Sequence, residues 1–358
     1  MLITIDARMI RHSGIGTYLE NIIPQLVTMN KHVQFSIIGD KKLLTEIIGN
    51  RENVHIIHTQ IPIYSLAEQI RLPRLIPKNT DVYWSPHYNI PIFYRGKLAV
   101  TVHDVFHLRM KEYVGFFKRM YAKIMFFCIK VKAKRINTNS FFTKSEITNY
   151  VGIDADKIKV TALGVDEMWR RPVSPPLLSE PYIIFIGNVK PNKNLITLLK
   201  SFEILMDDIS HYLIIAGKKD GFIINDIDSQ DYSEKLGKRI RFLGHVPKND
   251  LINYVKHSAL LVFPSIYEGF GLPPIEAMAC GCPVIAARSS SIPEVCGDAV
   301  LYFDPKDERE LAVQIKTVLQ NNEIREMLIK KGKDRSCKYS WEQCAKEISQ
   351  MLNEVFAK

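Results

Sequence analysis

The sequence has little cysteine, no long apolar run and, in its first half, few acidic residues. Its 358 residues include six cysteines, too few for the disulfide framework of a small secreted domain. The longest notable apolar run, Ile124–Ile129, has six residues, whereas a membrane-spanning helix needs about 20. Residues Met1–Asp6 carry neither a basic nor a long apolar segment, so we expect no signal peptide. The sequence therefore predicts a protein of the reducing cytoplasm.

The shortage of acidic residues is confined to one half of the chain. Residues 1–173 contain 25 Lys and Arg against 14 Asp and Glu, whereas residues 174–358 contain 23 against 24. The segment 109–135 alone has nine basic residues and one acidic residue, so it carries most of the net charge of +10. A basic surface of this kind fits an anionic partner, either a lipid surface or nucleic acid.

Short β-rich apolar runs alternate with longer helical patterns along the whole chain. The expected strands are Leu2–Ile5, Val33–Ile38, Val54–Ile57, Val82–Trp84, Leu98–Val102, Ile136–Asn139, Tyr182–Ile186, Tyr212–Ala216, Ile240–Leu243, Leu260–Phe263, Val284–Ala286 and Val300–Phe303. Near-continuous apolar strands separated by helices predict parallel sheets covered on both faces. The segment Arg171–Pro181, with four prolines, is predicted to be a linker. We therefore expect two doubly wound α/β domains, 1–172 and 173–340, with a helix over 341–358 that returns to the first.

One stretch of the second half has the composition of an anion site. The loop Gly269–Leu272 follows an expected strand and can bring bare backbone N–H groups close to a ligand. Two prolines suit the first turn of a helix over Pro274–Cys280, and the positive end of that helix would face the loop. We interpret the loop as a diphosphate site. Two carboxylates flank it, Glu268 and Glu276, and a carboxylate accepts paired hydrogen bonds from adjacent hydroxyls. Either glutamate alone fits a solvated or dipole-complementing side chain better than a ligand contact, but the combination with the glycines and prolines favours a ligand contact.

The whole stretch Ser265–Val284, followed by Ser291–Val295, resembles a known family. Glu268 and Glu276, with seven residues between them, match the E-x7-E signature of family 4 retaining glycosyltransferases. That family has the GT-B fold, in which two Rossmann-like domains face a cleft. The resemblance implies a nucleotide-sugar donor, bound chiefly by the second domain.

The resemblance also assigns roles to residues of the second half. Lys193, in the loop that begins at Gly187, would hold the donor diphosphate. The arginine usual in this loop is missing, with Asn188 and Asn192 in its place, and Lys190 lacks the bidentate fork of an arginine. Glu268 would bind the donor sugar and Glu276 the ribose. The further donor-binding candidates are Gly217, His245, Val246, Gly269, Phe270, Gly271 and Leu272.

The first half supplies fewer candidates. The loop that contains Ser13, Gly14 and Gly16 resembles the family's glycine loop, whose glycines let the backbone approach the diphosphate. His103, at the end of an expected strand, would reach the donor sugar near the reaction centre. A structural histidine at a strand end is the alternative for His103.

The segment 109–135 intersperses Lys118, Arg119 and Lys123 with aromatic residues and methionine. The apolar residues of this pattern are Phe116, Phe117, Tyr121, Met125 and Phe126. We interpret the pattern as a basic aromatic surface for anionic lipid headgroups. An ordinary helix with lysines lying over a core face is the alternative, and no nucleic-acid motif accompanies the segment. Cys280, Cys282 and Cys296 are expected to be buried thiols rather than metal ligands.

Taken together, these patterns predict a retaining hexosyltransferase that needs neither a catalytic metal nor a cofactor. The donor that the resemblance favours is GDP-mannose, and the acceptor a lipid-linked glycan of surface polysaccharide assembly. The protein would then lie on the inner face of the cell membrane. Three alternatives remain at this point: a transferase that uses UDP- or dTDP-linked glucose, N-acetylglucosamine or rhamnose; a nucleotide-sugar epimerase or hydrolase; and a basic membrane- or nucleic-acid-binding protein.

Overall fold

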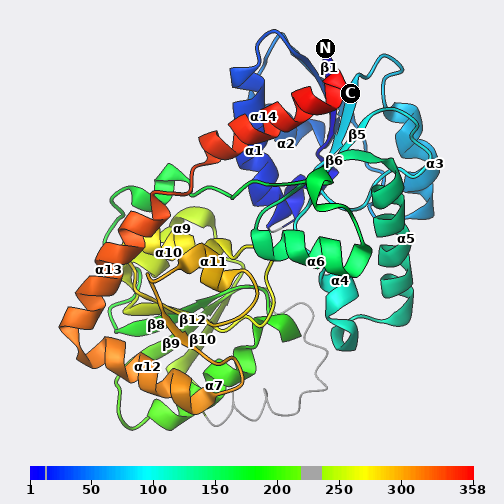
Figure 1. Cartoon of the computed structure of the whole chain (residues 1–358). Coiled ribbons are helices and arrows are strands. Elements are labelled where there is room, and N and C mark those ends of the chain that lie inside the picture. The colour runs from blue at the N-terminus through cyan, green and yellow to red at the C-terminus, as the bar shows by residue number, and fades with distance from the viewer. Residues whose placement is uncertain (13, 219–235) are drawn as a thin grey trace. The chain divides into compact units, whose positions relative to one another are not determined.

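The structure is a computed structural model of the whole chain, and it describes residues 1–12, 14–218 and 236–358. Ser13 of the predicted glycine loop lies outside these residues. The chain divides into two compact units (Figure 1). Unit 1 comprises Met1–Gly164 and Ser340–Lys358, and unit 2 comprises Val165–Tyr339. The dividing point lies eight residues before the expected boundary at 172/173.

Unit 1 is a seven-stranded parallel sheet in the order β3-β2-β1-β4-β5-β6-β7. Its strands are β1 (Leu2–Asp6), β2 (Gln34–Gly39), β3 (Val54–His58), β4 (Val82–Ser85), β5 (Leu98–Val102), β6 (Ala133–Thr138) and β7 (Ile158–Val160). The interior strand β1 pairs with both neighbours over Ile3–Ile5, where Ile5 lies opposite Ile37 of β2 and Trp84 of β4. The three-residue β7 was missed by the sequence prediction. The other six strands are confirmed.

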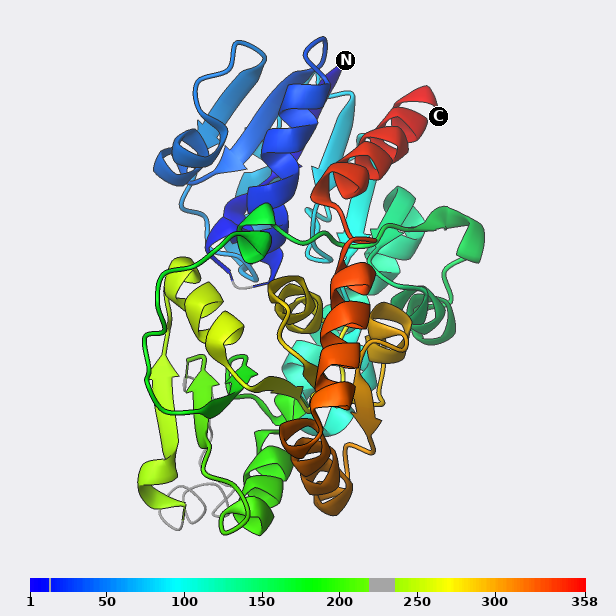
Figure 2. The ribbon, with the colours of Figure 1, turned by 90° about the vertical axis from the view of Figure 1, so that its left-hand side faces the viewer.

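Helices cover both faces of the unit 1 sheet. They are α1 (Ile15–Met29), α2 (Lys41–Ile48), α3 (Leu66–Leu75), α4 (Phe106–Arg109), α5 (Phe116–Lys132), α6 (Phe141–Val151) and α14 (Trp341–Ala357). Apolar residues of α3, α5 and α6 form one core with residues of β4, β5 and β6. On the other face α14 packs beside α1 (Figure 2). The final helix thus completes the unit in which the chain begins.

Unit 2 is a six-stranded parallel sheet in the order β10-β9-β8-β11-β12-β13. Its strands are β8 (Tyr182–Ile186), β9 (Tyr212–Ala216), β10 (Ile240–Gly244), β11 (Leu260–Phe263), β12 (Val284–Ala287) and β13 (Leu301–Phe303). Its helices are α7 (Leu195–Leu205), α9 (Lys248–His257), α10 (Leu272–Cys280), α11 (Ile292–Cys296), α12 (Glu308–Gln320) and α13 (Asn322–Ser336). Helices α7 and α12 pack on one face of the sheet, whereas α10 packs with α9 and α13. All six predicted strands are present, and both units have the predicted doubly wound form.

The proline-rich segment predicted to be a linker is part of unit 2. The buried side chain of Asn253 on α9 donates to the carbonyl oxygens of Ser174 and Pro175 at 2.9 and 3.1 Å. Its Oδ1 accepts from the N–H of Leu177 at 3.2 Å. Proline has no N–H to donate, so the segment relies on its carbonyl groups, and a second residue of α9, Lys256, donates to the carbonyl of Arg171 at 3.1 Å. Within the described parts of the chain, every helix is too short or too polar to cross a membrane.

Candidate functional site

Two loops at the carboxyl ends of the unit 2 strands bring Lys193 and Glu268 into an ion pair. Lys193 ends the short helix Pro191–Lys193 that follows β8, and Glu268 lies in the loop between β11 and α10. The Nζ of Lys193 donates to Oε1 of Glu268 at 2.5 Å, and the two side chains are 19% and 16% exposed. An ammonium group has three N–H donors, and this bond uses one of them. The pair is therefore a charged feature that a polar ligand can reach.

Two asparagines hold these loops together. The carbonyl of Asn192 accepts from the N–H of Ile266 at 2.8 Å, and its side chain donates to the carbonyl of Tyr267 at 3.2 Å. The side chain of Asn194 donates to the carbonyl of Pro264 at 3.2 Å. Asn194 has a φ of 53°, a left-handed conformation that asparagine tolerates better than most residues. Asn192, which with Asn188 lies where the resemblance implies an arginine, thus has a structural role in this chain.

Two serines of the loop after β12 fix the backbone of Glu268. The Oγ of Ser290 accepts from the N–H of Glu268 at 3.0 Å. The Oγ of Ser291 donates to the carbonyls of Glu268 and Phe270 at 3.0 and 3.1 Å. Ser290 has a φ of 49°, so this loop is also strained. From the sequence, Ser289–Ser291 could contact ribose or phosphate or form an ordinary polar loop, and neither interpretation includes this contact with the Glu268 backbone.

Helix α10 begins next to Glu268, at Leu272, as the loop analysis predicted to within two residues. Gly271 precedes it with a φ of 94°, and a Cβ there would lie 2.6 Å from Cδ1 of Ile292. Only glycine fits this position. No side chain caps the helix start among the described residues, so its first N–H groups and partial positive charge are suited to an anion. The ring of Phe270 packs at 5.5 Å on Tyr339 and is buried; only its backbone can serve a ligand.

The carboxyl ends of β8, β9 and β10 lie at the same edge of the unit 2 sheet as the loops of Lys193 and Glu268. The N–H of Gly187 donates to the carbonyl of Ala216, and the N–H of Gly217 donates to the carbonyl of Gly244, both at 2.9 Å. A Cβ on Gly217 would lie 2.0 Å from the carbonyl oxygen of Gly187, so close strand packing requires this glycine. His245 is exposed and Val246 is partly buried. The structure therefore places the predicted donor-binding residues Gly217, His245 and Val246 at neighbouring strand ends.

Glu276 is a partly buried carboxyl group on α10. Burial raises its pKa to about 7, while the Lys248 ammonium lowers it and the charge of Asp166 raises it further. Lys248 and Asp166 themselves form an ion pair at 2.6 Å. A carboxyl group with a pKa near 7 changes its charge in the physiological range, which makes it a functional candidate in its own right.

His103 of unit 1 has partners for both ring nitrogens. Its Nε2 lies 2.9 Å from the carbonyl of Pro86, which can only accept, so Nε2 carries the proton and donates. Nδ1 then accepts from the side-chain amide of Asn139 at 2.8 Å. Burial lowers the pKa of His103 to about 4, so the ring is neutral at pH 7. This geometry fits a polar contact or a structural histidine and leaves neither nitrogen free to take up a proton.

The two glycines of the predicted glycine loop differ in structure. Gly14 is exposed and precedes α1 with a φ of 35°. Gly16 is buried, its N–H donates to the carbonyl of His12 at 2.6 Å, and a Cβ there would lie 2.5 Å from the carbonyl oxygen of Ile10. Gly16 therefore lets the helix start pack closely on the preceding turn.

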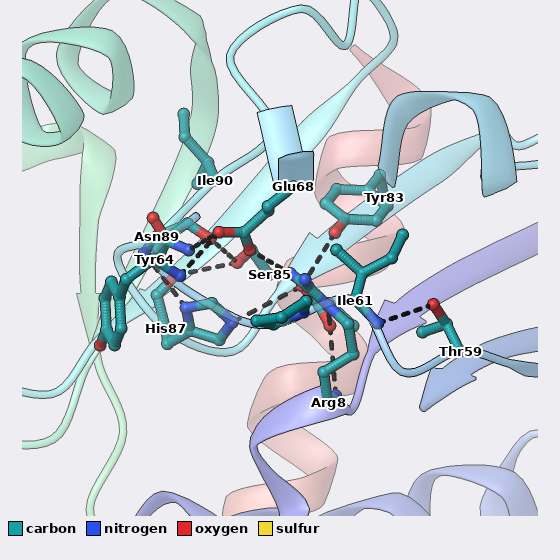
Figure 3. A network of polar contacts seen from close by, with 12 residues as sticks. Arg8, Thr59, Ile61, Tyr64, Glu68, Tyr83, Ser85, His87, Asn89 and Ile90 are labelled. Carbon is teal, nitrogen blue, oxygen red and sulfur yellow. Dashed lines mark hydrogen bonds and ion pairs between the residues drawn. The ribbon is translucent and has the colours of Figure 1, made fainter. Parts of the chain in front are cut away.

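The sequence analysis also missed a buried charged network at the carboxyl edge of unit 1 (Figure 3). Arg8 forms a bidentate pair with Asp6 at 2.8 and 2.7 Å and an ion pair with Glu68. Glu68 also accepts from Asn89 at 2.6 Å, and the N–H of Asn89 donates to Nδ1 of His87 at 3.1 Å. Burial raises the pKa of Asp6, but the Arg8 guanidinium outweighs this effect and holds it well below its usual value. Ser65 followed by Glu68 has the pattern of an ordinary helix capping box, and nothing in the sequence marks that glutamate as buried.

The predicted basic aromatic surface lies on α5, but the structure divides its apolar residues between two faces. Met125 and Phe126 are buried in the core, with Tyr121 partly covered. The interpretation that they belong to the lipid-facing surface is wrong, because these positions face the sheet. Phe116 and Phe117 are exposed as predicted.

A second set of apolar residues on α5 is exposed. We call this set the apolar stripe of α5, and it consists of Phe117, Met120, Ile124, Phe127 and Val131. Their spacing of three and four residues puts them on one face of the helix. Lys118 and Lys123 are exposed on the same helix, and Arg119 is partly exposed. Exposed apolar residues in such a row mark an interaction surface rather than ordinary solvent-facing helix.

Cys280, Cys282 and Cys296 are buried as expected. Residues 1–12, 14–218 and 236–358 contain no group of three or more His, Cys, Asp or Glu side chains placed to hold a metal ion.

The chain is similar in sequence to known proteins. Residues 170–335 match the family model "Glycosyl transferases group 1". The chain is 33% identical over 280 residues to the O-antigen chain mannosyltransferase B of Escherichia coli, covering 74% of this chain and 71% of that protein. It is 27% identical over 242 residues to the O-antigen chain mannosyltransferase RfbU of Salmonella typhimurium, covering 68% of this chain and 66% of that protein.

Solved structures match over nearly the whole chain. Anabaena Alr3699/HepE in complex with UDP and glucose superposes with a TM-score of 0.78 at 17% identity, covering 99% of this chain and all of that one. WaaG, a glycosyltransferase involved in lipopolysaccharide biosynthesis, superposes with a TM-score of 0.72 at 13% identity, covering 98% and 99% of the two chains. The fold is therefore GT-B.

Proposed function

This chain belongs to the glycosyl transferases group 1 family and is a glycosyltransferase, and on that premise we propose that it transfers mannose from GDP-mannose to a glycan of surface polysaccharide assembly. The observation that supports the mannosyl donor is the 33% identity to an O-antigen chain mannosyltransferase over 71% of that relative's length. The proposal extends that relative's sugar and setting to this chain.

We further propose that the carboxyl edge of unit 2 holds the nucleotide-sugar. Lys193 and the uncapped start of α10 would meet the diphosphate, since both carry positive charge. Glu268 would accept hydrogen bonds from the donor sugar hydroxyls and Glu276 from the ribose. Ser290 and Ser291 fix the Glu268 backbone, so the carboxylate is positioned before a ligand arrives.

In this proposal the protein acts on the leaving group. As the sugar–phosphate bond breaks, negative charge develops on the diphosphate, and preorganised charges aimed at it lower the barrier. Transfer would retain the anomeric configuration without a covalent enzyme intermediate, and the departing phosphate would accept the proton of the acceptor hydroxyl. No metal takes part, so activity should persist in EDTA.

We also propose that the apolar stripe of α5 and its neighbouring basic residues place unit 1 on an anionic membrane. Such a helix lies in the membrane interface with its apolar face among the headgroups, and each Lys or Arg near an anionic leaflet adds about 1 kcal/mol. A lipid-linked acceptor would then be met at the surface where it resides.

A donor screen tests the function. The purified protein is incubated with GDP-mannose, UDP-glucose, UDP-N-acetylglucosamine and dTDP-rhamnose, and nucleotide release is measured. Binding of GDP, UDP and dTDP is followed by thermal melting. We expect turnover of GDP-mannose and protection by GDP. Turnover of a UDP- or dTDP-sugar instead would replace the donor, and an isomerised donor with no transfer would indicate an epimerase. No melting shift with any nucleotide at millimolar concentration would contradict the assignment of the site.

A further inference from the structure

Among the described residues of unit 1, Tyr64 is the one residue other than glycine whose φ is positive. It lies in the loop between β3 and α3 and has a φ of 58°. Outside glycine, the described residues contain two others with positive φ, Asn194 and Ser290. Asn194 directly follows Lys193, and Ser290 accepts a hydrogen bond from the N–H of Glu268. Such a conformation costs about 1–3 kcal/mol for a bulky residue and persists only where surrounding contacts impose it, often at ligand-binding positions. Tyr64 therefore merits a functional explanation.

The buried network of unit 1 imposes this conformation. The N–H of Tyr64 donates to Oε2 of Glu68 at 2.9 Å. Glu68 is fully buried, and Arg8 and Asn89 hold its carboxylate from the other sides (Figure 3). Arg8 is in turn fixed by its bidentate pair with Asp6. A chain of charge-assisted hydrogen bonds thus runs from the end of β1 to the backbone of Tyr64.

The ring so positioned is the outer member of a group of three tyrosines, which we call the tyrosine cluster: Tyr64, Tyr88 and Tyr121. Tyr64 is 45% exposed, and its ring centroid lies 6.1 Å from each of the other two. Tyr88 is stacked at 5.2 Å on the buried ring of Phe126, which anchors the cluster to the core. The cluster therefore presents a rigid aromatic surface rather than a mobile side chain.

A carboxylate lies beside this surface. Asp104 follows β5, at the same carboxyl edge of the sheet as the loops of Tyr64 and Tyr88. The chain then enters α4, whose His107 ring lies 5.6 Å from the ring of Tyr88. The Asp104 charge also contributes to raising the pKa of Tyr64 and Tyr88, for which burial is the larger cause. One oxygen, Oδ1, accepts from the N–H of Phe106 at 2.9 Å, which orients the side chain. Aromatic faces with one oriented carboxylate are the combination that suits a sugar, because pyranose C–H groups pack on the negative face of a ring while hydroxyls donate to carboxylates.

We infer that the tyrosine cluster binds a pyranose ring of the acceptor glycan, with the ring of Tyr64 against its C–H face and Asp104 accepting from a hydroxyl. This inference rests on the proposed glycosyltransfer to a glycan. The occupant is the acceptor because the predicted diphosphate and ribose contacts, Lys193, Glu268 and Glu276, belong to unit 2. Tyr121 links the cluster to the membrane proposal, since it lies on α5 together with the apolar stripe. A lipid-linked acceptor could thus place its sugar on one side of α5 and its lipid on the other.

Saturation-transfer NMR with four methyl glycosides tests this site: the α-mannoside, the N-acetyl-β-glucosaminide, the β-galactoside and the α-rhamnoside. The ring is removed by Tyr64→Gly, because glycine accepts a φ of 58° without strain and the fold is preserved. The conservative variant is Tyr64→Trp. The control is Tyr150→Ala on α6, where the removed ring is 43% exposed. GDP-induced thermal shift is measured in parallel.

We expect at least one glycoside to receive saturation from the wild-type protein. The signal should fall at least about tenfold in Tyr64→Gly and persist in Tyr64→Trp and Tyr150→Ala. GDP protection should stay unchanged throughout. No signal with any of the four glycosides, or an undiminished signal in Tyr64→Gly, would overturn the inference. Loss of GDP protection in the wild-type protein would instead count against the proposed function, so the two failures are distinguishable.

As a test of positioning, Glu68→Gln keeps the shape of the side chain and removes its charge. We expect the acceptor KM to rise severalfold with the donor KM unchanged, because Glu68 orients the backbone of Tyr64 and the proposed donor contacts belong to unit 2. Equal changes in both KM values would indicate general destabilisation and would contradict the positioning role.

Discussion

At the scale of single residues, the pair Lys193–Glu268 carries the most weight in the proposed site. Lys193→Ala should lower mannosyl transfer at least ~100-fold, since it removes an oriented charge from the developing diphosphate. A useful control is Lys316→Ala, which breaks the pair of Lys316 with Asp208, also 2.5 Å long but well exposed. Such a surface pair contributes little, and activity should stay near wild type. Rates of the Lys193 variant within a few-fold of wild type, at equal Tm, would sink the assignment.

Glu276 predicts a pH dependence. Its pKa of about 7 means that the carboxylate form, which the ribose contact needs, gains population as pH rises through 7. Nucleotide affinity should therefore increase from pH 6 to pH 8 in the wild type and stay flat in Glu276→Gln. Isothermal titration with GDP at the two pH values measures this.

The same group predicts an opposite trend in stability. Because folding raises its pKa above the ordinary 4.5, the folded state is favoured below about pH 4.5, and this contribution is lost as pH rises towards 7 and above. At pH 8 Glu276→Gln should be more stable than wild type by about 1–3 kcal/mol, measured by urea unfolding. The exposed Glu323 of α13 offers a control as Glu323→Gln, with no expected change. A Glu276→Gln variant that is less stable at pH 8 would contradict the pKa assignment.

The residues that the sequence could indicate are those whose loop position and neighbours form a motif. Lys193, Glu268 and Glu276 follow strand ends or open a helix, and the structure places them at one edge of one sheet. Glu68 lacked such a signal, because its importance comes from contacts with segments distant in sequence. Long-range hydrogen bonds leave no local pattern.

At the scale of elements, α5 has one face that packs in the core of unit 1 and another whose apolar residues are exposed. Changing Lys118, Arg119 and Lys123 to Glu should release the protein from anionic vesicles, because attraction to the leaflet becomes repulsion. Nucleotide binding should be unaffected. The matched control changes three exposed lysines of unit 2, Lys330, Lys333 and Lys338, to Glu, which alters the net charge equally. If both triple variants sediment alike with vesicles, α5 has no special role.

The start of α10 gives a second prediction. Gly271→Ala should lower stability by about 1–3 kcal/mol and weaken nucleotide binding, because the methyl group meets Ile292 at 2.6 Å in a left-handed conformation. Gly152→Ala controls for conformation, since Gly152 is also left-handed, with φ 70° and ψ 35°, and its added carbon meets only the flexible end of Lys130 at 3.1 Å. Thermal melting with and without GDP separates the two effects. Equal behaviour of the two variants would mean that close packing at Gly271 is unimportant.

Strands that form a clear apolar run were predicted from the sequence, and the strand without such a run was not. Twelve of the thirteen described strands are apolar runs that the pattern indicates, whereas β7 has three residues. The pattern located α5 but misassigned Met125 and Phe126, because a helix that is apolar on two faces has no unique inward side.

At the scale of the whole molecule, α14 makes unit 1 discontinuous in sequence. Its buried residues include Trp341, Ile348 and Leu352, and a Cβ on Gly164 would lie 2.1 Å from the backbone of Trp341. Deleting residues 340–358 should therefore destabilise unit 1 while leaving the second sheet folded. In calorimetry, the unfolding transition of unit 1 should disappear or its Tm should fall by more than about 10 °C. GDP should still raise the Tm of the unit 2 transition. A truncated protein that melts like the full chain would show that α14 is dispensable.

The discontinuity also has a consequence for biosynthesis. A ribosome makes the first 164 residues, then all of unit 2, and only then the helix that completes unit 1. At ~5–20 residues per second the nascent chain waits roughly 10 to 35 s between these events. During that interval the side of α1 that later meets α14 is exposed in an unfinished domain, which is a natural binding surface for a chaperone. The second unit, continuous in sequence, can fold first although it is translated later.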